Sequence, residues 1–125
     1  MGNAETSRSE GGQNSGLQLA GWIEDGAHVL PIRVYFEDTD FSGIVYHASY
    51  VRWFERGGSD FLRVLGIHHS DLIAPGERSE PAAFVVRRLE VDYLRPARID
   101  QVIEVRTRCE ELGSAALWLE QQVMR

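Results

Sequence analysis

Residues 33–50 read RVYFEDTDFSGIVYHASY, and this stretch contains the strand, the turn and the helix start on which the fold depends. Apolar side chains at Ile32, Val34 and Phe36 alternate with more polar ones, which is the pattern of a half-buried strand. Residues 38–43 have the composition of a turn, and after them the apolar spacing changes to the period of a helix. The sequence therefore predicts a strand, an acidic turn and a helix in direct succession.

The predicted helix is long and amphipathic. Gly66 supplies a stop at its C-terminal end. Gly57 and Gly58 lie inside it, where each costs roughly 1 kcal/mol of helix stability relative to alanine, so we expect a packing reason such as close contact with a sheet. The apolar stripe of the helix consists of Tyr46, Tyr50, Phe54, Phe61 and Leu65.

Three further runs alternate as strands do, over Ala83–Leu94, Gln101–Cys109 and Ala115–Met124. The connections over residues 95–100 and 110–114 are short enough for hairpins. The residues expected to share a face are Val85, Leu89, Val91 and Tyr93 in the first run, Ile103, Val105, Thr107 and Cys109 in the second, and Leu117, Leu119 and Val123 in the third. One strand, one long helix and an antiparallel meander predict an α+β fold with the helix on one face of the sheet.

The length and composition predict a single compact domain. The chain has 125 residues, of which 43% are hydrophobic, enough for one core. Residues 1–16 are polar and glycine-rich, so we expect them to form a disordered tail, with one domain over residues 17–125. No apolar run is long enough to cross a bilayer, and the start lacks the features of a secretory signal, which predicts a cytoplasmic protein without an integral membrane segment.

The charge and the cysteine content exclude several kinds of chemistry. The formal net charge is −6 and the basic residues are spread along the chain, which disfavours nucleic-acid binding. All 13 basic residues are arginine, so a lysine Schiff base is excluded. Cys109 is the single cysteine, so an internal disulfide and a CxxC pair are excluded as well, and its alternation with buried positions predicts a small buried hydrophobe.

The acidic turn before the helix is the strongest candidate for chemistry. The N-terminus of a helix presents unpaired N–H groups, which can bind a carbonyl oxygen and stabilise the oxyanion that develops on it. A carboxylate beside those groups could attack the carbonyl or activate water, which is the arrangement that acyl transfer needs. From spacing alone, an aspartate before a helix is more often a cap worth about 0.5–2 kcal/mol, so both interpretations stay open at this point.

The remaining candidates are weaker. His47 lies in the first helical turn, where the helix dipole favours a neutral imidazole, although an isolated histidine is more often a surface residue. His68, His69 and Asp71 could contribute to a metal site, but adjacent side chains seldom converge on one ion, so no metal site is predicted. Three aromatic residues are expected in the core or an interface rather than against a substrate: Trp53, Tyr93 and Trp118.

Two stretches of the chain carry a resemblance to a known family. The run RVYFEDTD at 33–40, followed by GIVYHASY at 43–50 and FER at 54–56, closely resembles the Tol-Pal-associated acyl-CoA thioesterases of the 4-hydroxybenzoyl-CoA thioesterase branch of the hotdog superfamily. AFVVRRLEVDY at 83–93, with RPAR at 95–98, is similar to the same subfamily. The resemblance extends over about residues 28–125.

The resemblance implies a fold, an activity and partners. The fold is the hotdog fold, in which an antiparallel sheet wraps around one long helix. The activity is that of a thioester hydrolase acting on a short-chain or aromatic acyl-CoA, without a metal or redox cofactor. The implied assemblies are homodimers that join their sheets edge to edge, or homotetramers, with active sites at the dimer interface. Acyl carrier protein is a further partner to consider.

The site residues also follow from the resemblance, position by position. The catalytic aspartate of the family falls on Asp40, as a nucleophile or as a general base for water. The backbone N–H near His47 would hold the carbonyl oxygen, and the His47 side chain would line the pocket. Tyr46 would line the pocket beside His47, and Gly43 would let the turn approach the substrate. The residues themselves add Tyr50 as a further substrate-binding candidate, and Glu55, two turns beyond His47, as support for it, with an exposed salt bridge as the equal alternative. Arg87 and Arg88 point to opposite faces of their predicted strand, so one of them, assigned to Arg87, could contact the phosphates of coenzyme A, although exposed arginines are more often solvated or ion-paired.

One departure from the family concerns the end of the sheet. Its members usually continue beyond the Ala115–Met124 strand into one more strand, so we expect either an unpaired edge or a gap in the sheet here. A non-catalytic hotdog module that binds acyl-CoA or acyl carrier protein is therefore the alternative function. A hotdog dehydratase agrees less well, because the acidic turn matches the thioesterases.

Overall fold

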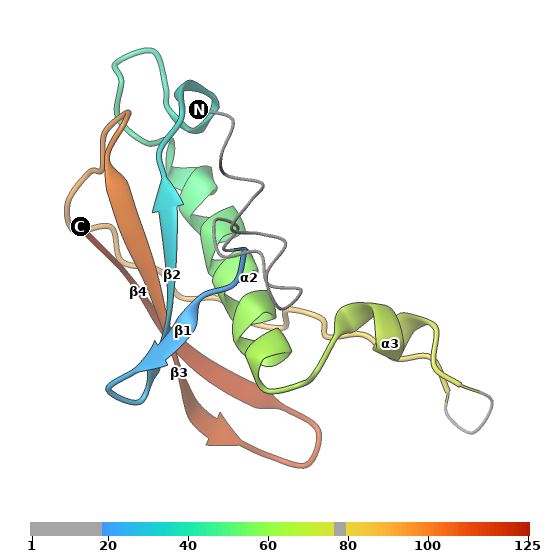
Figure 1. Ribbon diagram of the computed structural model, residues 1–125. Coiled ribbons are helices and arrows are strands. Elements are labelled where there is room, and N and C mark those ends of the chain that lie inside the picture. The colour runs from blue at the N-terminus through green and yellow to red at the C-terminus, as the bar shows by residue number, and fades with distance from the viewer. Residues whose placement is uncertain (1–18, 77–79) are drawn as a thin grey trace, which may run out of the picture.

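Four antiparallel strands and one long helix make up the body of the protein in this computed structural model, which describes residues 19–76 and 80–125 (Figure 1). The predicted disordered tail at residues 1–16 lies outside the described residues. The strands are β1 (Trp22–Glu24), β2 (Ala27–Arg33), β3 (Val102–Leu112) and β4 (Leu117–Met124), in the order β1-β2-β3-β4. The helices are the short 3-10 helix η2 (Phe36–Asp38), α2 (His47–Val64) and α3 (His69–Ile73).

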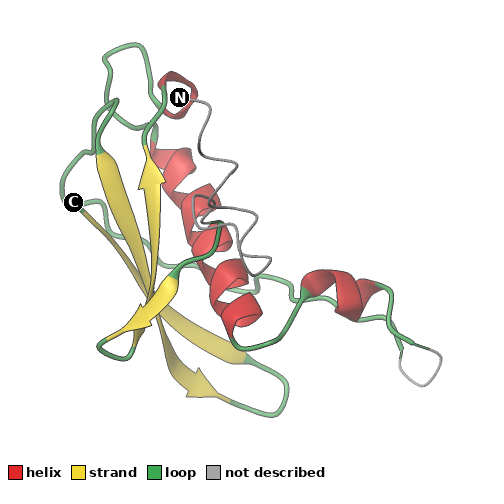
Figure 2. Cartoon of the chain, in the orientation of Figure 1, coloured by secondary structure: helices red, strands yellow, loops and turns green. Residues whose placement is uncertain are grey.

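The helix α2 lies against one face of the sheet, as Figure 2 shows, and the core lies between them. The sheet contributes alternate side chains of β2 and β3, because successive residues of a strand point to opposite faces. The helix contributes its buried stripe. The core residues are Leu30, Ile32, Val34, Val45, Tyr50, Trp53, Ala97, Ile103 and Val105. This arrangement confirms the predicted α+β hotdog class.

At Gly57 the helix α2 lies close against the sheet, which confirms the predicted packing reason for a glycine in the helix. A Cβ atom added at Gly57 would lie 2.6 Å from Cγ1 of Val105, which is fully buried. At Gly58 the nearest atom would be Cδ1 of Leu119, at an ordinary 3.4 Å. The two adjacent glycines therefore differ in how much room a side chain would have.

We expect Gly57→Ala to lower the free energy of unfolding by about 1 kcal/mol, because overpacking costs about 1–3 kcal/mol and the gain in helix propensity returns about 1 kcal/mol. Gly58→Ala is the matched control and should leave stability unchanged or raise it by up to about 1 kcal/mol. Urea unfolding of both variants measures the difference. Equal stabilities for the two variants would contradict the close approach at Gly57.

The segment Ala83–Leu94 corrects the sequence prediction, because it forms no strand in the structure. A strand is stable only when a neighbour receives its backbone N–H and C=O groups. The sheet ends at β4, and a groove separates β4 from the C-terminal part of this segment. The apolar alternation was present, but within the described residues the segment has no neighbour with which to form a ladder. The predicted gap in the sheet is therefore found beside β4.

Smaller corrections concern residues at the ends of elements. Phe36 is exposed in η2, because the strand ends at Arg33 and the chain turns before residue 36. Tyr46 and Leu65 flank α2 and are largely exposed. Cys109 is exposed as well, because the register of β3 and β4 shifts between Cys109 and Glu111 and burial along β3 ends at Thr107.

Other expectations about the elements are confirmed. The helix ends at Val64, and Gly66 adopts a positive φ of 88° just beyond it, where its N–H donates to the carbonyl of Arg63. β3 and β4 form the predicted antiparallel hairpin, and β4 alternates between half-buried and exposed side chains. In the part of the chain that the structure covers, no helix combines the length and the apolar character that a membrane span requires.

Candidate active site

The acidic turn closes into a tight loop that returns the chain to the start of α2. Thr39 and Val45 form an antiparallel bridge, and the N–H of Asp40 donates to the carbonyl of Ile44 at 2.9 Å. Gly43 adopts a φ of 83°, a conformation that glycine reaches without strain, and its N–H donates to the carbonyl of Asp40. The loop therefore depends on a glycine at the position where the sequence predicted one.

A second segment, residues 97–100, fixes this loop from the side. The N–H of Val45 donates to the carbonyl of Ala97 at 2.9 Å, and Ile44 forms a bridge with Arg98. The N–H of Ile99 donates to the carbonyl of Gly43 at 3.2 Å. The sequence analysis treated this segment as a plain turn. In the structure it holds the candidate catalytic loop in place.

The two aspartates of the turn have different roles. Asp38 is buried, and its carboxylate accepts hydrogen bonds from the N–H of Tyr35 at 2.9 Å and from the Arg52 guanidinium at 3.3 Å. Its carbonyl accepts the N–H of Tyr46 and the hydroxyl of Ser49, both near the start of α2. All of these contacts are internal, so Asp38 orders the turn and the helix start. Sequence reasoning did not single it out.

Asp40 is the aspartate of the turn that is available for chemistry. Its Oδ1 accepts the hydroxyl of Ser42 at 2.5 Å and the N–H of Ser42 at 2.8 Å. The Ser42 hydroxyl, and after it the Ser42 N–H, lower the pKa of Asp40 below its usual value. Among the described residues, Oδ2 accepts no hydrogen bond. Asp40 is thus held as an ionised carboxylate by one oxygen, with the other oxygen free.

The first turn of α2 offers two free donors beside this loop. His47 and Ala48 are exposed, and in the residues that the structure describes neither backbone N–H donates a hydrogen bond. The N–H of Ser49, by contrast, donates to the carbonyl of Tyr46 at 2.8 Å. Free N–H groups at the positive end of a helix dipole suit a carbonyl oxygen or an oxyanion.

Aromatic rings surround the start of the helix. The ring of Tyr46 lies 4.5 Å from the imidazole of His47, and Tyr93 meets the same imidazole edge-on at 6.1 Å. Tyr50 is buried beneath them, packs on Tyr93 and Trp53, and accepts the N–H of Ala97 with its hydroxyl. Tyr46, His47, Tyr50 and Tyr93 therefore lie together at the start of α2, and the assignment of the first three to a substrate site stays a prediction.

Other candidates lie apart from this cluster. Glu55 is exposed on α2 and forms no ion pair within the described residues. Arg87 is exposed in the unpaired segment, next to Arg88, which pairs with Glu90. His68 contacts Asp71 at 3.7 Å, whereas His69 faces the hydroxyl of Ser59 at 3.1 Å. The two histidines have different partners, and the described part of the chain holds no group of three or more metal-ligating residues.

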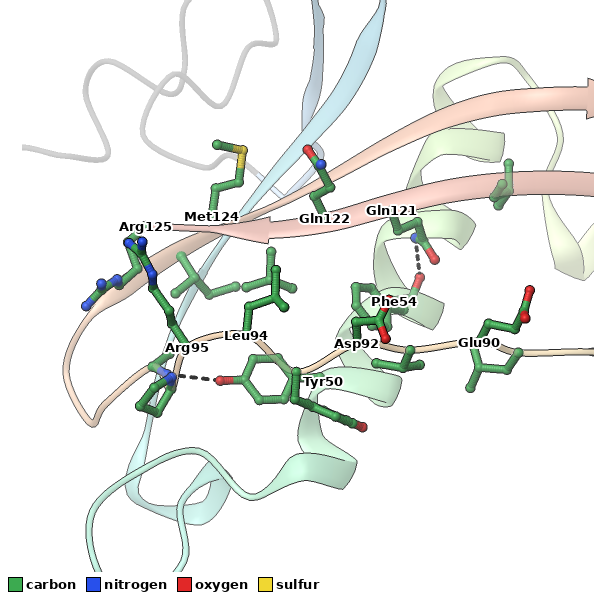
Figure 3. Close-up of a pocket in the computed structure, with 18 residues that line it drawn as sticks. Tyr50, Phe54, Glu90, Asp92, Leu94, Arg95, Gln121, Gln122, Met124 and Arg125 are labelled. Carbon is green, nitrogen blue, oxygen red and sulfur yellow. Dashed lines mark hydrogen bonds between the residues drawn. The ribbon is translucent and has the colours of Figure 1, made fainter.

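A groove of about 800 Å³ runs between β4 and the segment that follows Leu89 (Figure 3). Figure 3 shows Tyr50 and Phe54 of α2 at its floor, and Gln121 of β4 bonded to the carbonyl of Phe54 at 2.7 Å. Gln122, Met124 and Arg125 line one side, and Asp92, Leu94 and Arg95 line the other. The groove thus begins where Tyr50 touches Tyr93, next to the first turn of α2.

The comparisons with known proteins agree with this fold. The family model of the thioesterase superfamily matches residues 42–125, so the chain belongs to this family of thioester hydrolases, as the resemblance predicted.

Among the curated proteins, the acyl-CoA thioesterase YbgC of Haemophilus influenzae is 39% identical over 101 residues, which are 81% of this chain and 71% of that protein. Two solved structures are also similar. A probable thioesterase from Bartonella henselae is 45% identical with a TM-score of 0.73, and 78% of each chain is covered. A gentisyl-coenzyme A thioesterase is 28% identical with a TM-score of 0.69, over 77% of this chain and 74% of that one.

Proposed function

We propose that the protein hydrolyses an acyl-CoA thioester to a carboxylate and free coenzyme A at the start of α2. The observation that carries this proposal is the pairing of an ionised Asp40 that has one free oxygen with two free N–H groups on His47 and Ala48. Family membership and the name of the relative from Haemophilus influenzae support the choice of a thioester.

The reaction needs a polarised carbonyl and a nucleophile. In the proposed complex, the thioester oxygen accepts the free N–H groups of the first helical turn, which stabilise the charge that develops on it. As a general base, Asp40 removes a proton from water while the oxygen of that water attacks the carbonyl carbon. The tetrahedral intermediate then expels the thiolate of coenzyme A, which receives the proton. As a nucleophile, Asp40 would attack the carbonyl carbon and displace the coenzyme A thiolate, forming an anhydride that water hydrolyses afterwards.

The aromatic cluster favours a small or aromatic acyl group. Tyr46 and His47 stand exposed at the loop, and Tyr50 closes the floor beneath them. Flat side chains of this kind pack well against a planar acyl group. The solved gentisyl-coenzyme A thioesterase, which carries an aromatic acyl group in its name, supports this class. Gly43 lets the loop approach the substrate closely, while Glu55 and Arg87 remain proposals for supporting His47 and for binding the coenzyme A phosphates.

The implied homodimer or homotetramer is also part of the proposal. Phe36 and Phe41 are exposed on either side of the acidic turn. Large apolar side chains gathered at one place on a surface are typical of an interface, here with a second copy of the chain. Acyl carrier protein remains an alternative partner for the same surface.

Ser42→Ala should move the acid limb of the pH profile to higher pH. Asp40 acts when ionised, so activity falls as the pH drops through its pKa. The Ser42 hydroxyl lowers that pKa, and its removal returns the pKa toward the ordinary value. The pH dependence of kcat/KM measures the shift. An unchanged or more acidic limb would contradict the assignment of Asp40 as the ionised group.

The experiment that tests the proposal is thiol release from a panel of short-chain, long-chain and aromatic acyl-CoAs, with the assembly sized by light scattering. We expect turnover that is fastest for the short or aromatic substrates. A folded oligomer that binds acyl-CoA in calorimetry but releases no thiol would overturn the proposal in favour of a non-catalytic binding module.

A further inference from the structure

Tyr93 connects the segment before Leu94 to the start of α2. Its hydroxyl donates to the backbone carbonyl of His47 at 3.1 Å. Within the described residues, this is the only hydrogen bond between residues 83–94 and α2. The ring of Tyr93 stands nearly perpendicular to the His47 imidazole, at 86°, and packs on Tyr50 at 5.7 Å. Tyr93 therefore bridges two residues of the helix from a separate part of the chain.

The carbonyl that Tyr93 binds belongs to the same peptide unit as a candidate oxyanion donor. The peptide between His47 and Ala48 is planar, so its C=O and its N–H point in opposite directions. A hydrogen bond to the carbonyl fixes the plane and with it the direction of the Ala48 N–H. It also polarises the amide, which makes the N–H a stronger donor, because hydrogen bonds in a chain strengthen one another.

We propose that Tyr93 is a positioning residue of the active site, which acts through the His47–Ala48 peptide to orient and strengthen the Ala48 N–H as an oxyanion donor. The inference rests on the proposed function, since it assumes that this N–H receives the thioester oxygen. The half-exposed Tyr93 is thus assigned a role that its sequence context did not indicate.

Tyr93→Phe tests the hydroxyl, because it keeps the ring and its contacts. We expect kcat for acyl-CoA hydrolysis to fall about two- to tenfold, the range for one lost hydrogen bond, with KM changed less than about twofold. The Ala48 amide proton, observed by NMR in the free protein, should move upfield because its peptide is less polarised. Tyr93→Leu removes the ring as well and should be at least as slow. Ser70→Ala, which removes an exposed hydroxyl on α3 away from the site, is the control.

The results separate this inference from the proposed function. An unchanged kcat in Tyr93→Phe would overturn the inference, as would a loss of kcat with an unmoved Ala48 resonance. If the wild type releases no thiol at all, the proposed function fails instead. In that case, the role of Tyr93 is tested by measuring the affinity of the wild type and of Tyr93→Phe for a ketone analogue. This analogue is an acyl-CoA in which a methylene group replaces the thioester sulfur. Weaker binding by Tyr93→Phe supports the inference, and equal binding overturns it.

Discussion

Asp40→Asn is expected to lower kcat for thiol release by about 10²–10⁴-fold, the contribution typical of a positioned general base. The amide keeps the size of the side chain and can still accept the hydroxyl and the N–H of Ser42 at Oδ1. It can neither remove a proton from water nor attack the carbonyl carbon efficiently. Steady-state thiol release with a substrate of the wild type measures the loss.

The control for this substitution is Asp71→Asn, which neutralises a highly exposed carboxylate on α3. We expect it to retain the kcat of the wild type. Unfolding midpoints and light scattering establish that both variants have the fold and the assembly of the wild type. An Asp40→Asn variant that keeps kcat within twofold of the wild type would show that another group performs the chemistry.

Asp60→Ala is expected to lower the free energy of unfolding by about 2–5 kcal/mol, because it leaves two hydrogen-bond donors unpaired and each buried unpaired donor costs about 1–3 kcal/mol. Oδ2 of Asp60 accepts Nε2 of His28 and the N–H of Gly21, both at 2.7 Å. His28 is fully buried, and its Nδ1 has no partner in the structure. Without Asp60, both ring nitrogens would be buried without a partner, and α2 would lose its hydrogen bond from Gly21, which lies directly before β1.

Two further variants calibrate this result. Asp60→Asn keeps a carbonyl oxygen that can accept the same hydrogen bonds, so its loss of stability should be smaller. Glu90→Ala breaks the exposed pair with Arg88, and we expect a loss of at most about 1 kcal/mol. Urea unfolding measures all three variants. A loss below about 1 kcal/mol for Asp60→Ala would mean that the pair with His28 contributes little to stability.

The parts of the fold that depend on residues close together in the sequence were predictable. The alternation through Val34 and the change to helical spacing after the turn are local signals, and they gave the strand and the helix with small errors at their ends. The reasons for Gly43 and Gly57 were also predictable, because a tight turn and a close approach to the sheet both favour glycine.

The errors have a common physical cause, which is that pairing is not a local property. Residues 83–94 alternate like a strand, yet no described strand lies beside them to receive their backbone hydrogen bonds. The strand β1 was missed, because three residues are too few to show an alternating pattern and only their pairing with β2 makes them a strand. Cys109 lies two residues after Thr107, where the next buried position of the alternation would fall, but the buried positions of β3 end at Thr107.

The candidate site likewise contains residues that a local motif indicates and residues whose roles depend on contacts distant in the sequence. Asp40 and His47 could be proposed from the sequence, because they lie in one continuous motif that resembles a family. The roles of Asp38 and Tyr93 could not be assigned. The contact of Tyr93 with His47 spans 46 residues, and the inward orientation of Asp38 depends on Arg52 and on the backbone of Tyr35. The His28–Asp60 pair spans 32 residues and belongs to no motif.

The central claim is that the thioester carbonyl lies between the carboxylate of Asp40 and the free N–H groups at the start of α2. The most direct measurement is an NMR titration of the backbone amides with the ketone analogue, which keeps the carbonyl and cannot be hydrolysed. We predict that the amide protons of His47 and Ala48 shift downfield together as the site saturates, because they then donate to the carbonyl oxygen. Saturable binding that leaves both resonances unmoved would contradict the claim.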